Sequence, residues 1–438
     1  MSENKTKLAV IGAGPGGYAA AFLAADLGLP VTLIDPEANP GGVCLYRGCI
    51  PSKTLLHAAK VVAETEKARQ WGLNFKDLSV DPTALRQWKN RVVEQLTGGL
   101  GQLVKRRKIE HIRGHAAFMD EHTLKIEDQE GQTRQVSFEN AIIATGSRAA
   151  TLPLFEDGGD FVWNATAALD MARIPENLLV VGGGYIGLEL GSVYAGLGAR
   201  VSLAEMTAHL LPGADRDLVR FLHKRLEGLF EDIQLEARIE AVERQKNGLK
   251  VTMADKEGNS HTRLFDQVLV AVGRRPRSDG LGLEKIGIAT DEKGFVRVDE
   301  QRRTGVKNIF AIGDVAGEPM LAHKASHEGR VAAEVIAGQK SVFEPRAIPG
   351  VVFTDPEIAW TGLTESQARD RKLTYEVARF PWGASSRAMT LGAPDGLTKL
   401  LVDPKTERIL GVGIVGSGAG ELIGEAVLAI EMGANATD

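Results

Sequence analysis

The residues of this sequence with the most distinctive chemistry are its two cysteines, Cys44 and Cys49, which are separated by four residues. A thiol pair this close can form and break a disulfide, and a structural cross-link closing so short a loop has little use in a reducing cytosol. Two unrelated buried thiols, or a metal site completed by His57, are the alternatives, although no third cysteine is present. The spacing therefore favours a redox pair.

The residues that follow the first cysteine fit this hypothesis. Residues five apart in a regular helix rise about 7.5 Å, whereas a disulfide needs Cα atoms about 4.4–6.8 Å apart, so the segment must be distorted or the pair unbridged. Gly48 provides the backbone freedom for a distortion, and Pro51 suits the first turn of a following helix. The N-terminus of that helix would stabilise a thiolate on Cys49. Lys53 adds positive charge one turn later, unless it is a solvated surface lysine.

A glycine-rich turn before the cysteines predicts a dinucleotide site. An apolar strand at residues 8–11 leads into the turn, a helix follows to about residue 27, and a second strand at 31–34 ends at Asp35. Gly12 permits the sharp turn, Gly14 lets a pyrophosphate approach the backbone, and Gly17 lets the helix pack closely on the strand. Phosphates are stabilised at the helix N-terminus, and Asp35 can accept hydrogen bonds from ribose hydroxyls.

The same unit is repeated later in the chain. A strand at 178–181, the turn from Gly182 to Gly187, a helix to about residue 197 and a strand at 201–203 lead to Glu205. Each acid lies 23 residues after the first glycine of its turn, because 35 − 12 and 205 − 182 are equal. One such motif is a weak signal, but two at equal spacing predict two sites. Glu205 favours NAD over NADP because it would repel a 2′-phosphate, and Arg200, placed before the strand, is the one feature that opposes this interpretation.

Composition narrows the class of protein. A chain of 438 residues is too long for one core and predicts two to four domains. The net charge of −5, without a long basic run, argues against a nucleic-acid binder. No apolar run approaches the ~18 residues that span a bilayer, and the polar residues 1–7 do not resemble a signal peptide. A cytoplasmic protein is expected, with no membrane or nucleic-acid partner.

These motifs and several shorter stretches resemble one known family. The Gly12–Gly17 turn is joined by Gly-Gly-Val-Cys-x4-Cys-Ile-Pro-Ser-Lys at 41–53 and by segments at 96–100, 144–147, 271–274, 312–314, 320–324, 380–382 and 420–422. Together they resemble the pyridine nucleotide-disulfide oxidoreductases, and within them the branch that oxidises dihydrolipoamide. The resemblance implies an α/β fold with two Rossmann-like dinucleotide-binding domains and a C-terminal α+β interface domain. The expected segments are an FAD-binding domain at 1–147, an NAD-binding domain at 148–275, a central segment completing the FAD site at 276–346 and a dimerisation domain at 347–438.

The resemblance also implies FAD and NAD as cofactors and assigns their sites. The residues expected at FAD are Gly12, Gly14, Gly17, Asp35, Pro36, Gly41, Gly42, Val43, Cys44, Lys53, Ala116, Thr145, Gly146, Ser147, Asp314, Met320, Leu321, Ala322 and His323. The residues expected at NAD are Gly182, Gly184, Tyr185, Ile186, Gly187, Glu205 and Gly273, with Arg274 beside them. Tyr185 could cover the nicotinamide pocket or could be an ordinary packed tyrosine.

Four residues are expected to be catalytic. By the resemblance, Cys44 exchanges with the substrate disulfide, Cys49 lies against the flavin, Lys53 lies near the flavin N5 and Glu189 faces Lys53. Electrons would pass from dihydrolipoamide through the cysteines and FAD to NAD. Tyr46 and Arg47 replace the Asn-Val most often found between these cysteines, and they would alter the substrate mouth or the redox potential in a direction that the sequence leaves open.

The remaining expectations concern metals, partners and rivals. His323 and His327 could share a helix face, but no further ligand accompanies them, so no metal is expected. The implied partners are a second copy of the chain, lipoyl domains or a lipoyl-carrier protein, and a peripheral subunit-binding domain, in a 2-oxo acid dehydrogenase or glycine-cleavage system.

The family's general base is a histidine in a His-x-His-Pro-Thr segment. Because the sequence ends at Asp438, where that segment would begin, a truncated chain is expected. The rival functions are a glutathione or mercuric reductase, which Glu205 and the lack of further cysteines oppose, and a mainly docking flavoprotein subunit.

Overall fold

The computed structural model describes residues 4–76 and 78–438, which divide into two compact units. The first unit comprises residues 1–51, 87–150 and 274–344, and the second comprises 52–86, 151–273 and 345–438. Strands alternate with helices along the chain, which confirms the predicted α/β fold. The chain enters each unit more than once, so residues far apart in sequence share a core.

The first unit is built on a sheet with the strand order β3-β2-β1-β6-β5-β4, to which β17 adds beside β6. Pairings between β1, β2, β3, β6 and β17 are parallel, whereas β4 and β5 form an antiparallel extension. The strands are β1 (Asn4–Ile11), β2 (Val31–Ile34), β3 (Glu110–Ile112), β4 (His115–Asp120), β5 (Thr123–Glu127), β6 (Thr133–Ile143) and β17 (Ile309–Ala311). The expected strands 8–11 and 31–34 are therefore neighbours at the centre of the sheet.

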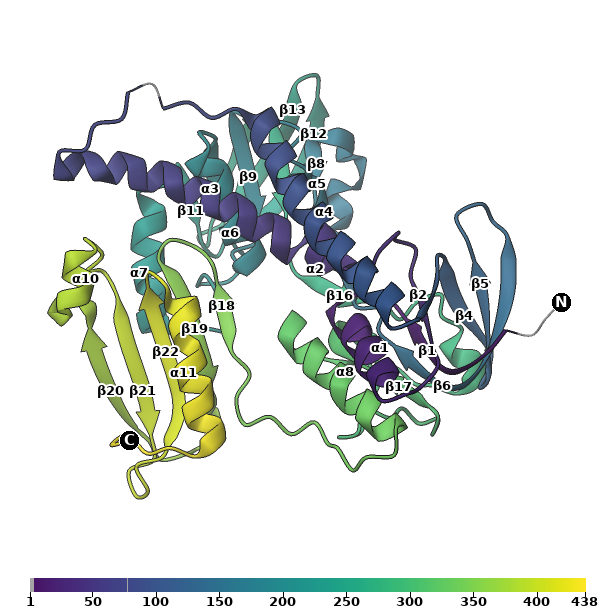
Figure 1. The fold of residues 1–438 in the computed structure, drawn as a ribbon. Coiled ribbons are helices and arrows are strands. Elements are labelled where there is room, and N and C mark those ends of the chain that lie inside the picture. Colours follow the sequence, from purple (N-terminus) through teal and green to yellow (C-terminus); the bar gives the residue numbers. More distant parts are fainter. Residues whose placement is uncertain (1–3, 77) are drawn as a thin grey trace. The chain divides into compact units, whose positions relative to one another are not determined.

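Two helices distant in sequence pack together in the first unit. In Figure 1, α1 (Pro15–Asp26, purple) and α8 (Ala322–Ile336, green) lie side by side. Small residues permit this approach: a Cβ added to Gly329 would stand 2.4 Å from the backbone oxygen of Gly16. Ala20, which is also in α1, is fully buried. The Ala-rich helix predicted after the first glycine turn is thus a core helix, held between a sheet and a second helix.

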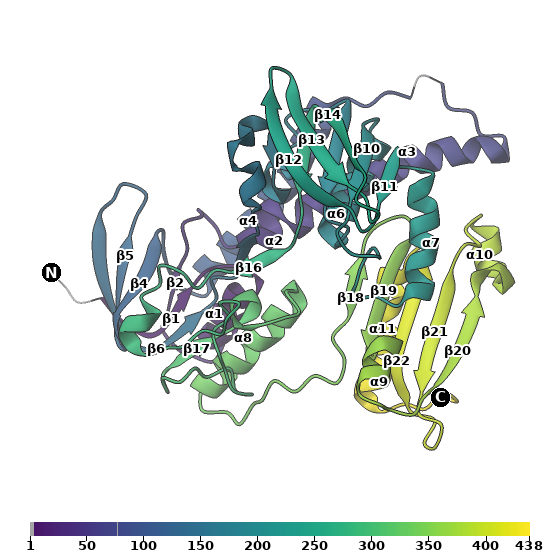
Figure 2. The ribbon, with the colours of Figure 1, turned by 180° about the vertical axis from the view of Figure 1, so that it is seen from behind.

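The second unit contains the repeated nucleotide-binding element. Its parallel sheet has the order β11-β10-β9-β15-β8, and a three-stranded antiparallel sheet β12-β13-β14 accompanies it (Figure 2). The elements are β8 (Val162–Trp163), β9 (Asn177–Val181), α6 (Tyr185–Gly196), β10 (Arg200–Ala204), α7 (Arg216–Glu227), β11 (Asp232–Gln234), β12 (Arg238–Gln245), β13 (Gly248–Ala254), β14 (Ser260–Phe265) and β15 (Gln267–Val270).

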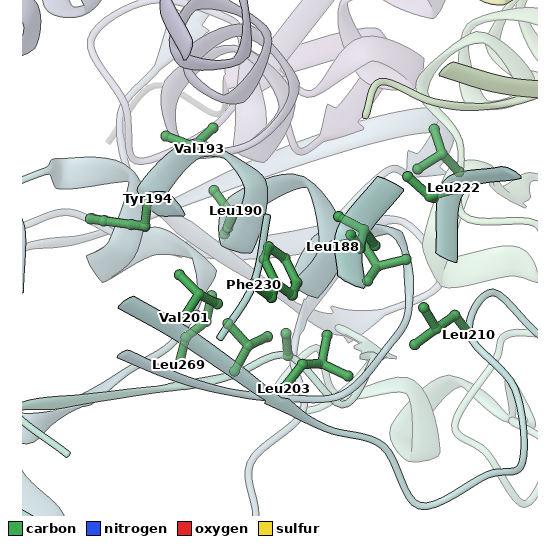
Figure 3. Close-up of a cluster of buried hydrophobic side chains, with 14 of the residues drawn as sticks. Leu188, Leu190, Val193, Tyr194, Val201, Leu203, Leu210, Leu222, Phe230 and Leu269 are labelled. Atoms are coloured by element: carbon green, nitrogen blue, oxygen red, sulfur yellow. The ribbon is translucent and has the colours of Figure 1, made fainter. Parts of the chain in front are cut away.

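A buried cluster fixes α6 on this sheet, as Figure 3 shows. Leu188 of α6, Val201 of β10 and Leu269 of β15 are each fully buried within it. Burying a leucine side chain contributes roughly 1.5–3 kcal/mol, so many such contacts hold the helix in place. Tyr194 is also fully buried, and its hydroxyl donates to the carbonyl of Ala168 at 2.7 Å. The start of α6, where the second glycine turn lies, is therefore held by a rigid support.

The C-terminal part of the second unit is an antiparallel sheet with the order β18-β19-β22-β21-β20, covered by α11 (yellow in Figure 1). The elements are β18 (Gly350–Val352), β19 (Glu357–Gly362), α9 (Glu365–Asp370), β20 (Glu376–Pro381), α10 (Ser386–Thr390), β21 (Leu397–Val402), β22 (Ile409–Gly416) and α11 (Ala419–Met432). This arrangement agrees with the α+β character expected for the end of the chain. In the part of the chain that the structure describes, no helix has the length and apolar character needed to cross a bilayer.

Candidate functional site

The first glycine turn brings backbone donors to the acid at the end of β2. Gly12 has φ = +100°, and a Cβ on Gly17 would stand 1.9 Å from the Gly12 oxygen, so the turn and the close packing both require glycine. The Ala13 N–H donates to Asp35 Oδ2 at 2.7 Å, and the Glu37 N–H donates to Asp35 Oδ1 at 3.0 Å. The predicted acid is thus oriented by the turn itself.

A cavity of about 300 Å³ opens beside this acid. Gly12, Asp35, Ala116 and Thr145 all line it, and all four are residues expected at FAD. Burial raises the pKa of the Asp35 carboxyl, while the Ala13 N–H and the charges of His111 and Arg47 oppose that rise. The cavity therefore has a buried acceptor at its wall, as a ribose site needs.

The second glycine turn reproduces the first. Gly182 has φ = +110°, and a Cβ on Gly187 would stand 2.1 Å from the Gly182 oxygen. The Gly183 N–H donates to Glu205 Oε2 at 2.6 Å, and the Thr207 N–H donates to Glu205 Oε1 at 2.7 Å. Each donor lies 170 positions after its counterpart in the first turn, because 183 − 13 and 207 − 37 both equal 170. The equal spacing seen in the sequence reflects an equal geometry.

Arg200 does not stand before the strand, as the sequence suggested, because it is the first residue of β10. It lies at the end of β10 opposite to Glu205, and its guanidinium pairs with Glu176 at 2.7 Å and donates to Asn177 at 3.0 Å. Arg200, the one feature of the sequence that opposed NAD in favour of NADP, therefore interacts with other side chains at the end of the strand opposite to Glu205.

The cysteines lie at a break between two helices. Cys44 is in α2 (Gly42–Arg47), and Cys49 is the first residue of α3 (Cys49–Ala68). Gly48 separates the helices, and a Cβ there would stand 2.9 Å from the Val43 oxygen and 3.4 Å from the Cys44 Cα. The expected distortion is present, and Gly48 permits a close backbone approach. Both cysteines are half-buried.

Lys53 and Glu189 form the ion pair that the resemblance predicted. Lys53 Nζ lies 2.7 Å from Glu189 Oε2, and Glu189 is 3% exposed. The other carboxylate oxygen accepts from the Phe353 N–H at 3.0 Å, and Lys53 Nζ lies 4.6 Å from the centre of the Phe353 ring. A cavity of about 260 Å³ adjoins Lys53 and Phe353. Both oxygens of the buried carboxylate are thus satisfied, and the Lys53 ammonium is held in a fixed place.

Ser147 links two other predicted residues. Its hydroxyl donates to Asp314 Oδ2, and the Arg274 guanidinium donates to Ser147 Oγ at 2.8 Å and to Ser147 O at 2.9 Å. Arg274 opens β16 (Arg274–Pro276), which pairs with β7 (Ser147–Ala149). Arg274 therefore contacts Ser147, one of the residues expected at FAD, through two hydrogen bonds.

The comparisons with known proteins agree with this arrangement. Residues 6–329 match the family described as pyridine nucleotide-disulphide oxidoreductase, and residues 348–438 match the dimerisation domain of the same family. The chain belongs to this family. Members of the family use FAD and NAD, and the matched dimerisation domain supports a homodimer.

Curated relatives and solved structures resemble the whole chain. The dihydrolipoyl dehydrogenase of Vibrio cholerae is 47% identical over 436 residues, which cover 100% of this chain and 91% of that protein. The dihydrolipoyl dehydrogenase of Haemophilus influenzae is 48% identical with the same coverage of 100% and 91%. The LpdA structure of Mycobacterium tuberculosis has a TM-score of 0.90 at 26% identity, covering 98% of this chain and 94% of that one. The Cu(II) complex of the flavoprotein disulfide reductase RclA of Escherichia coli has a TM-score of 0.87 at 29% identity, covering 99% and 94%.

The residues present fit both cofactors of the family. The glycine turns leave space where a Cβ would otherwise stand, since one added to Gly184 would meet nothing within 4 Å. The N-termini of α1 and α6 favour negative phosphates, and Asp35 and Glu205 present acceptors beside them. Tyr185, the first residue of α6, is 41% exposed. The sequence left open whether it is a cover or a packed residue, and its exposure argues against a packed tyrosine.

Met320 to His323 lie at the start of α8, and a cluster of buried charged side chains includes residues further along this helix. Glu328 is fully buried, pairs with Arg302 at 3.0 Å and Lys324 at 3.2 Å, and accepts from the Gly313 N–H at 2.6 Å. Lys324 Nζ also donates to the Gly317 carbonyl at 3.0 Å. The cluster orients the backbone on both sides of Asp314. Sequence reasoning missed it, because nothing in the spacing shows that these charges meet.

Tyr18 is a second residue that sequence reasoning missed. Burial raises the pKa of its phenol, and the charges of Cys44 and Cys49 raise it further. Tyr18 follows the last glycine of the first turn directly, and a tyrosine in an otherwise Ala-rich helix was the one signal available.

Among the described residues, one acidic group has the spacing of a metal site: Asp215, Asp217 and Glu365, whose ligand oxygens lie within 4.8 Å of one another. Lys399 occupies the centre of this group, with Nζ at 2.7 Å from Asp215, 2.7 Å from Asp217 and 3.0 Å from Glu365. The Lys399 ammonium occupies the position that a metal ion would take. The group therefore acts as an internal ion-pair cluster.

Proposed function

We propose that this chain is a dihydrolipoyl dehydrogenase, which oxidises dihydrolipoamide to lipoamide, reduces NAD and uses Cys44 and Cys49 as its redox pair. One observation carries the proposal: a cysteine pair at a helix break follows the strand–turn–helix–strand unit of the first glycine turn, and a second turn of equal geometry lies in the same chain. The curated relatives that match the full chain at 47% and 48% identity bear the same name.

The first turn and its cavity would hold FAD. Asp35 would accept hydrogen bonds from the ribose of the adenosine, and the N-terminus of α1 would neutralise the pyrophosphate. The other residues in contact with FAD would be Gly12, Gly14, Gly17, Pro36, Gly41, Gly42, Val43, Cys44, Lys53, Ala116, Thr145, Gly146, Ser147, Asp314, Met320, Leu321, Ala322 and His323. FAD, when bound, supplies a two-electron carrier between the cysteines and NAD.

The second turn would hold NAD in the same manner. Glu205 would accept from the 2′-hydroxyl of the ribose, which explains a preference for NAD. Gly182, Gly184, Ile186 and Gly187 would give the pyrophosphate access to the backbone, with Tyr185 and Gly273 at the edges of the site. The observed pairing of Arg200 with Glu176 supports this assignment, because it leaves the phosphate-repelling Glu205 without a compensating arginine from β10.

The cysteines would carry out thiol–disulfide exchange with the substrate. A thiolate of dihydrolipoamide attacks Cys44 Sγ of the disulfide, Cys49 leaves as a thiolate, and the second substrate thiolate closes lipoamide while releasing Cys44. The first position of α3 stabilises the Cys49 thiolate through the helix dipole. The ammonium of Lys53, held by Glu189, adds a positive charge one turn further along α3.

The partners follow from the substrate. Lipoyl groups are carried on lipoyl domains or lipoyl-carrier proteins, so these would present dihydrolipoamide to Cys44. A peripheral subunit-binding domain of a 2-oxo acid dehydrogenase would be a further partner of the homodimer. We also propose the segments 1–147, 148–275, 276–346 and 347–438 as the FAD, NAD, central and dimerisation parts of the chain.

The test compares the unsubstituted protein with Cys44→Ser under anaerobic conditions. The flavin absorbance is recorded while NADH and then lipoamide are added, and NADH formation from dihydrolipoamide and NAD is measured separately. We expect lipoamide to reoxidise the NADH-reduced flavin of the unsubstituted protein but not that of Cys44→Ser. Equal turnover in both proteins would exclude the redox role. Reoxidation by glutathione disulfide in place of lipoamide would instead favour a glutathione reductase.

A further inference from the structure

Two side chains between the cysteines reach back to the loop that precedes them. The Tyr46 hydroxyl donates to the Asn39 carbonyl at 3.0 Å. The Arg47 guanidinium forms an ion pair with Glu37 and lies 5.9 Å from the centre of the Tyr46 ring. The side chains of Arg47 and Glu37 are 39% and 30% exposed, so the pair is partly protected from solvent. Both contacts tie the end of α2 to the loop at residues 36–41.

The other end of this loop is fixed to the acid of the first dinucleotide site. The Glu37 N–H donates to Asp35 Oδ1, and the Gly41 N–H donates to the Ala13 oxygen at 2.8 Å. The Tyr46 ring packs on the end of the loop, since a Cβ on Gly41 would stand 3.0 Å from Tyr46 Cε2. These contacts connect the end of α2 to the residues that surround Asp35.

The same helix end is adjacent to the redox pair. Arg47 is followed by Gly48 and Cys49, and the backbone at Gly48 approaches Val43 and Cys44 closely. A disulfide holds its sulfurs about 2.05 Å apart, which two thiols cannot reach. Breaking the disulfide therefore separates the two sulfurs, a movement that rotation of the side chains or a shift of the end of α2 or the start of α3 can take up.

We propose that Tyr46 and Arg47 are positioning residues that couple the redox state of the cysteines to the affinity of the chain for FAD. The inference rests on the proposed roles of Cys44 and Cys49 as the redox pair and of Asp35 as a ribose acceptor. When exchange with dihydrolipoamide converts the disulfide to two thiols and yields lipoamide, the two tethers carry the resulting shift into the loop that orients Asp35.

The positive charge of Arg47 acts on the ribose site at Asp35, as its contacts do. Arg47 opposes the burial that raises the pKa of Asp35, as do the Ala13 N–H and the charge of His111. An ionised Asp35 is the better acceptor for ribose hydroxyls. A movement of Arg47 with the helix end therefore changes both the geometry and the charge of the ribose site.

Coupling of this kind is reciprocal. If the redox state changes the affinity for FAD by a given factor, FAD changes the equilibrium between disulfide and dithiol by the same factor. Such factors are typically about 5–150. Both quantities can be measured on the holoenzyme, which makes the inference testable from two sides.

The experiment measures the dissociation constant of FAD from free-flavin fluorescence on dilution, for the oxidised holoenzyme and for the enzyme reduced by dihydrolipoamide without NAD. The variants are Tyr46→Phe, which keeps the ring but removes the hydrogen bond to Asn39, and Arg47→Gln and Glu37→Gln, which break the same ion pair from either side. A swapped double variant, Glu37→Arg with Arg47→Glu, restores the pair with its charges exchanged. Lys7→Gln breaks the exposed Lys7–Glu139 pair (2.7 Å) on the same sheet and is the matched control.

We expect the ratio of the two dissociation constants to fall at least about fivefold when Tyr46→Phe is combined with Arg47→Gln. Both ion-pair variants should lower the ratio, Arg47→Gln by more because it also removes the positive charge that acts on Asp35, the swapped variant should recover part of the ratio, and Lys7→Gln should leave it unchanged. A ratio that the combined variant leaves intact would overturn the inference, and so would a swapped variant no better than Arg47→Gln alone.

The redox equilibrium against the lipoamide couple, read by thiol alkylation, is the second measurement and applies even to a variant that binds FAD weakly. Measured with and without FAD, the effect of FAD on this equilibrium should equal the ratio of dissociation constants and should shrink in the combined variant. An effect of FAD that the combined variant leaves unchanged would contradict the coupling. Failure of the inference and failure of the proposed function are distinguishable. An enzyme that turns over dihydrolipoamide but shows no effect of the variants keeps its function without this coupling. A protein without such turnover whose FAD affinity still follows the state of its thiols, reduced by dithiothreitol, keeps the coupling without the function.

Discussion

Lys399→Met removes a buried ammonium from the centre of three carboxylates and should strongly destabilise the second unit. Lys399 is fully buried, and its Nζ lies 2.7–3.0 Å from Asp215, Asp217 and Glu365. The cluster joins α7, α9 and β21, so it links the nucleotide-binding part of the unit to its C-terminal sheet. Methionine nearly matches the volume of lysine, so the substitution removes the charge with little change in packing.

The magnitude follows from the charges left behind. Removing one partner of a buried ion pair costs about 3–5 kcal/mol. The carboxylate oxygens lie within 4.8 Å of one another, and two unit charges at that distance repel by about 3.5 kcal/mol at an effective dielectric constant of 20. Arg379 pairs with Asp217 at 2.9 Å and Glu365 at 2.6 Å and offsets part of this repulsion. A loss of about 3–5 kcal/mol lowers the urea midpoint by about 1–1.7 M for a slope of about 3 kcal/mol per M.

Urea unfolding at pH 7 with saturating FAD measures the effect, because excess FAD keeps ligand stabilisation equal in both proteins. Lys250→Met is the matched control. Lys250 pairs with Glu243 at 3.2 Å, but both side chains are about half exposed (47% and 57%), and such pairs contribute about 0–1 kcal/mol. If Lys399→Met shifted the midpoint no more than Lys250→Met, the buried cluster would not stabilise the unit and the reasoning from burial would be refuted.

The deficit should depend on pH with a definite sign. Burial raises the pKa of Asp217, but hydrogen bonds from Lys399 and Arg379 outweigh burial and hold this pKa below the ordinary value of 3.8. Its stabilising contribution is therefore present above pH 3.8 and is lost as pH falls through the folded-state pKa. In Lys399→Met the pKa of this carboxyl rises, so protonation relieves the repulsion as pH falls from 7 towards 4. The difference in urea midpoint between the two proteins should shrink over this range, and a constant difference would contradict the electrostatic account.

Further substitutions test the two dinucleotide turns and the core. Gly17→Ala should yield protein without bound flavin, seen as lost absorbance near the flavin band, because its Cβ would stand 1.9 Å from a backbone oxygen. Gly187→Ala, with its Cβ 2.1 Å from the matching oxygen, should keep the flavin and raise the KM for NAD, and loss of flavin in this variant would contradict the assignment of the turns. Glu205→Ala should reduce kcat/KM for NAD about tenfold, the equivalent of one hydrogen bond of about 1–1.5 kcal/mol, and leave that for NADP unchanged or higher. Tyr194→Phe should cost about 1–2 kcal/mol in urea unfolding, since it leaves the buried carbonyl of Ala168 without its 2.7 Å donor.

The sequence predicted those parts of the fold whose signal is local. Apolar strands followed by glycine turns predicted β1–α1–β2 and β9–α6–β10 to within one or two residues, except that β1 begins at Asn4, four residues before the predicted start, because the turn chemistry and the helix start lie in a few consecutive positions. Gly48 was expected to allow a distortion, and the helix does break there. Local rules can find such features because the reason for each residue lies in its own neighbourhood.

Contacts between distant segments could not be predicted in this way. Glu189 meets the Phe353 N–H across 164 positions, and nothing in the spacing of either residue marks the pair. Glu328 and Gly313 are close in sequence, yet the charge of Glu328 gave no sign that it turns inward to a backbone N–H. The three-stranded sheet β12-β13-β14 was also not foreseen, since its two outer strands, β12 and β14, are rich in polar residues and carry a weak apolar signal. The resemblance to a family, and no local rule, indicated Ala116 as a cofactor residue.

The two dinucleotide turns share one hydrogen-bond geometry but differ in burial, and this difference suits their cofactors. Asp35 is 8% exposed and lies in the wall of a cavity, so a ribose bound to it is largely removed from solvent. Glu205 is only half-buried, and the next residue, Met206, is 73% exposed. Dissociation is slow when a ligand must leave a buried site, and fast when the same hydrogen bonds are made at the surface. A flavin that remains bound through many cycles requires the first environment, and a nicotinamide nucleotide that leaves after each hydride transfer requires the second.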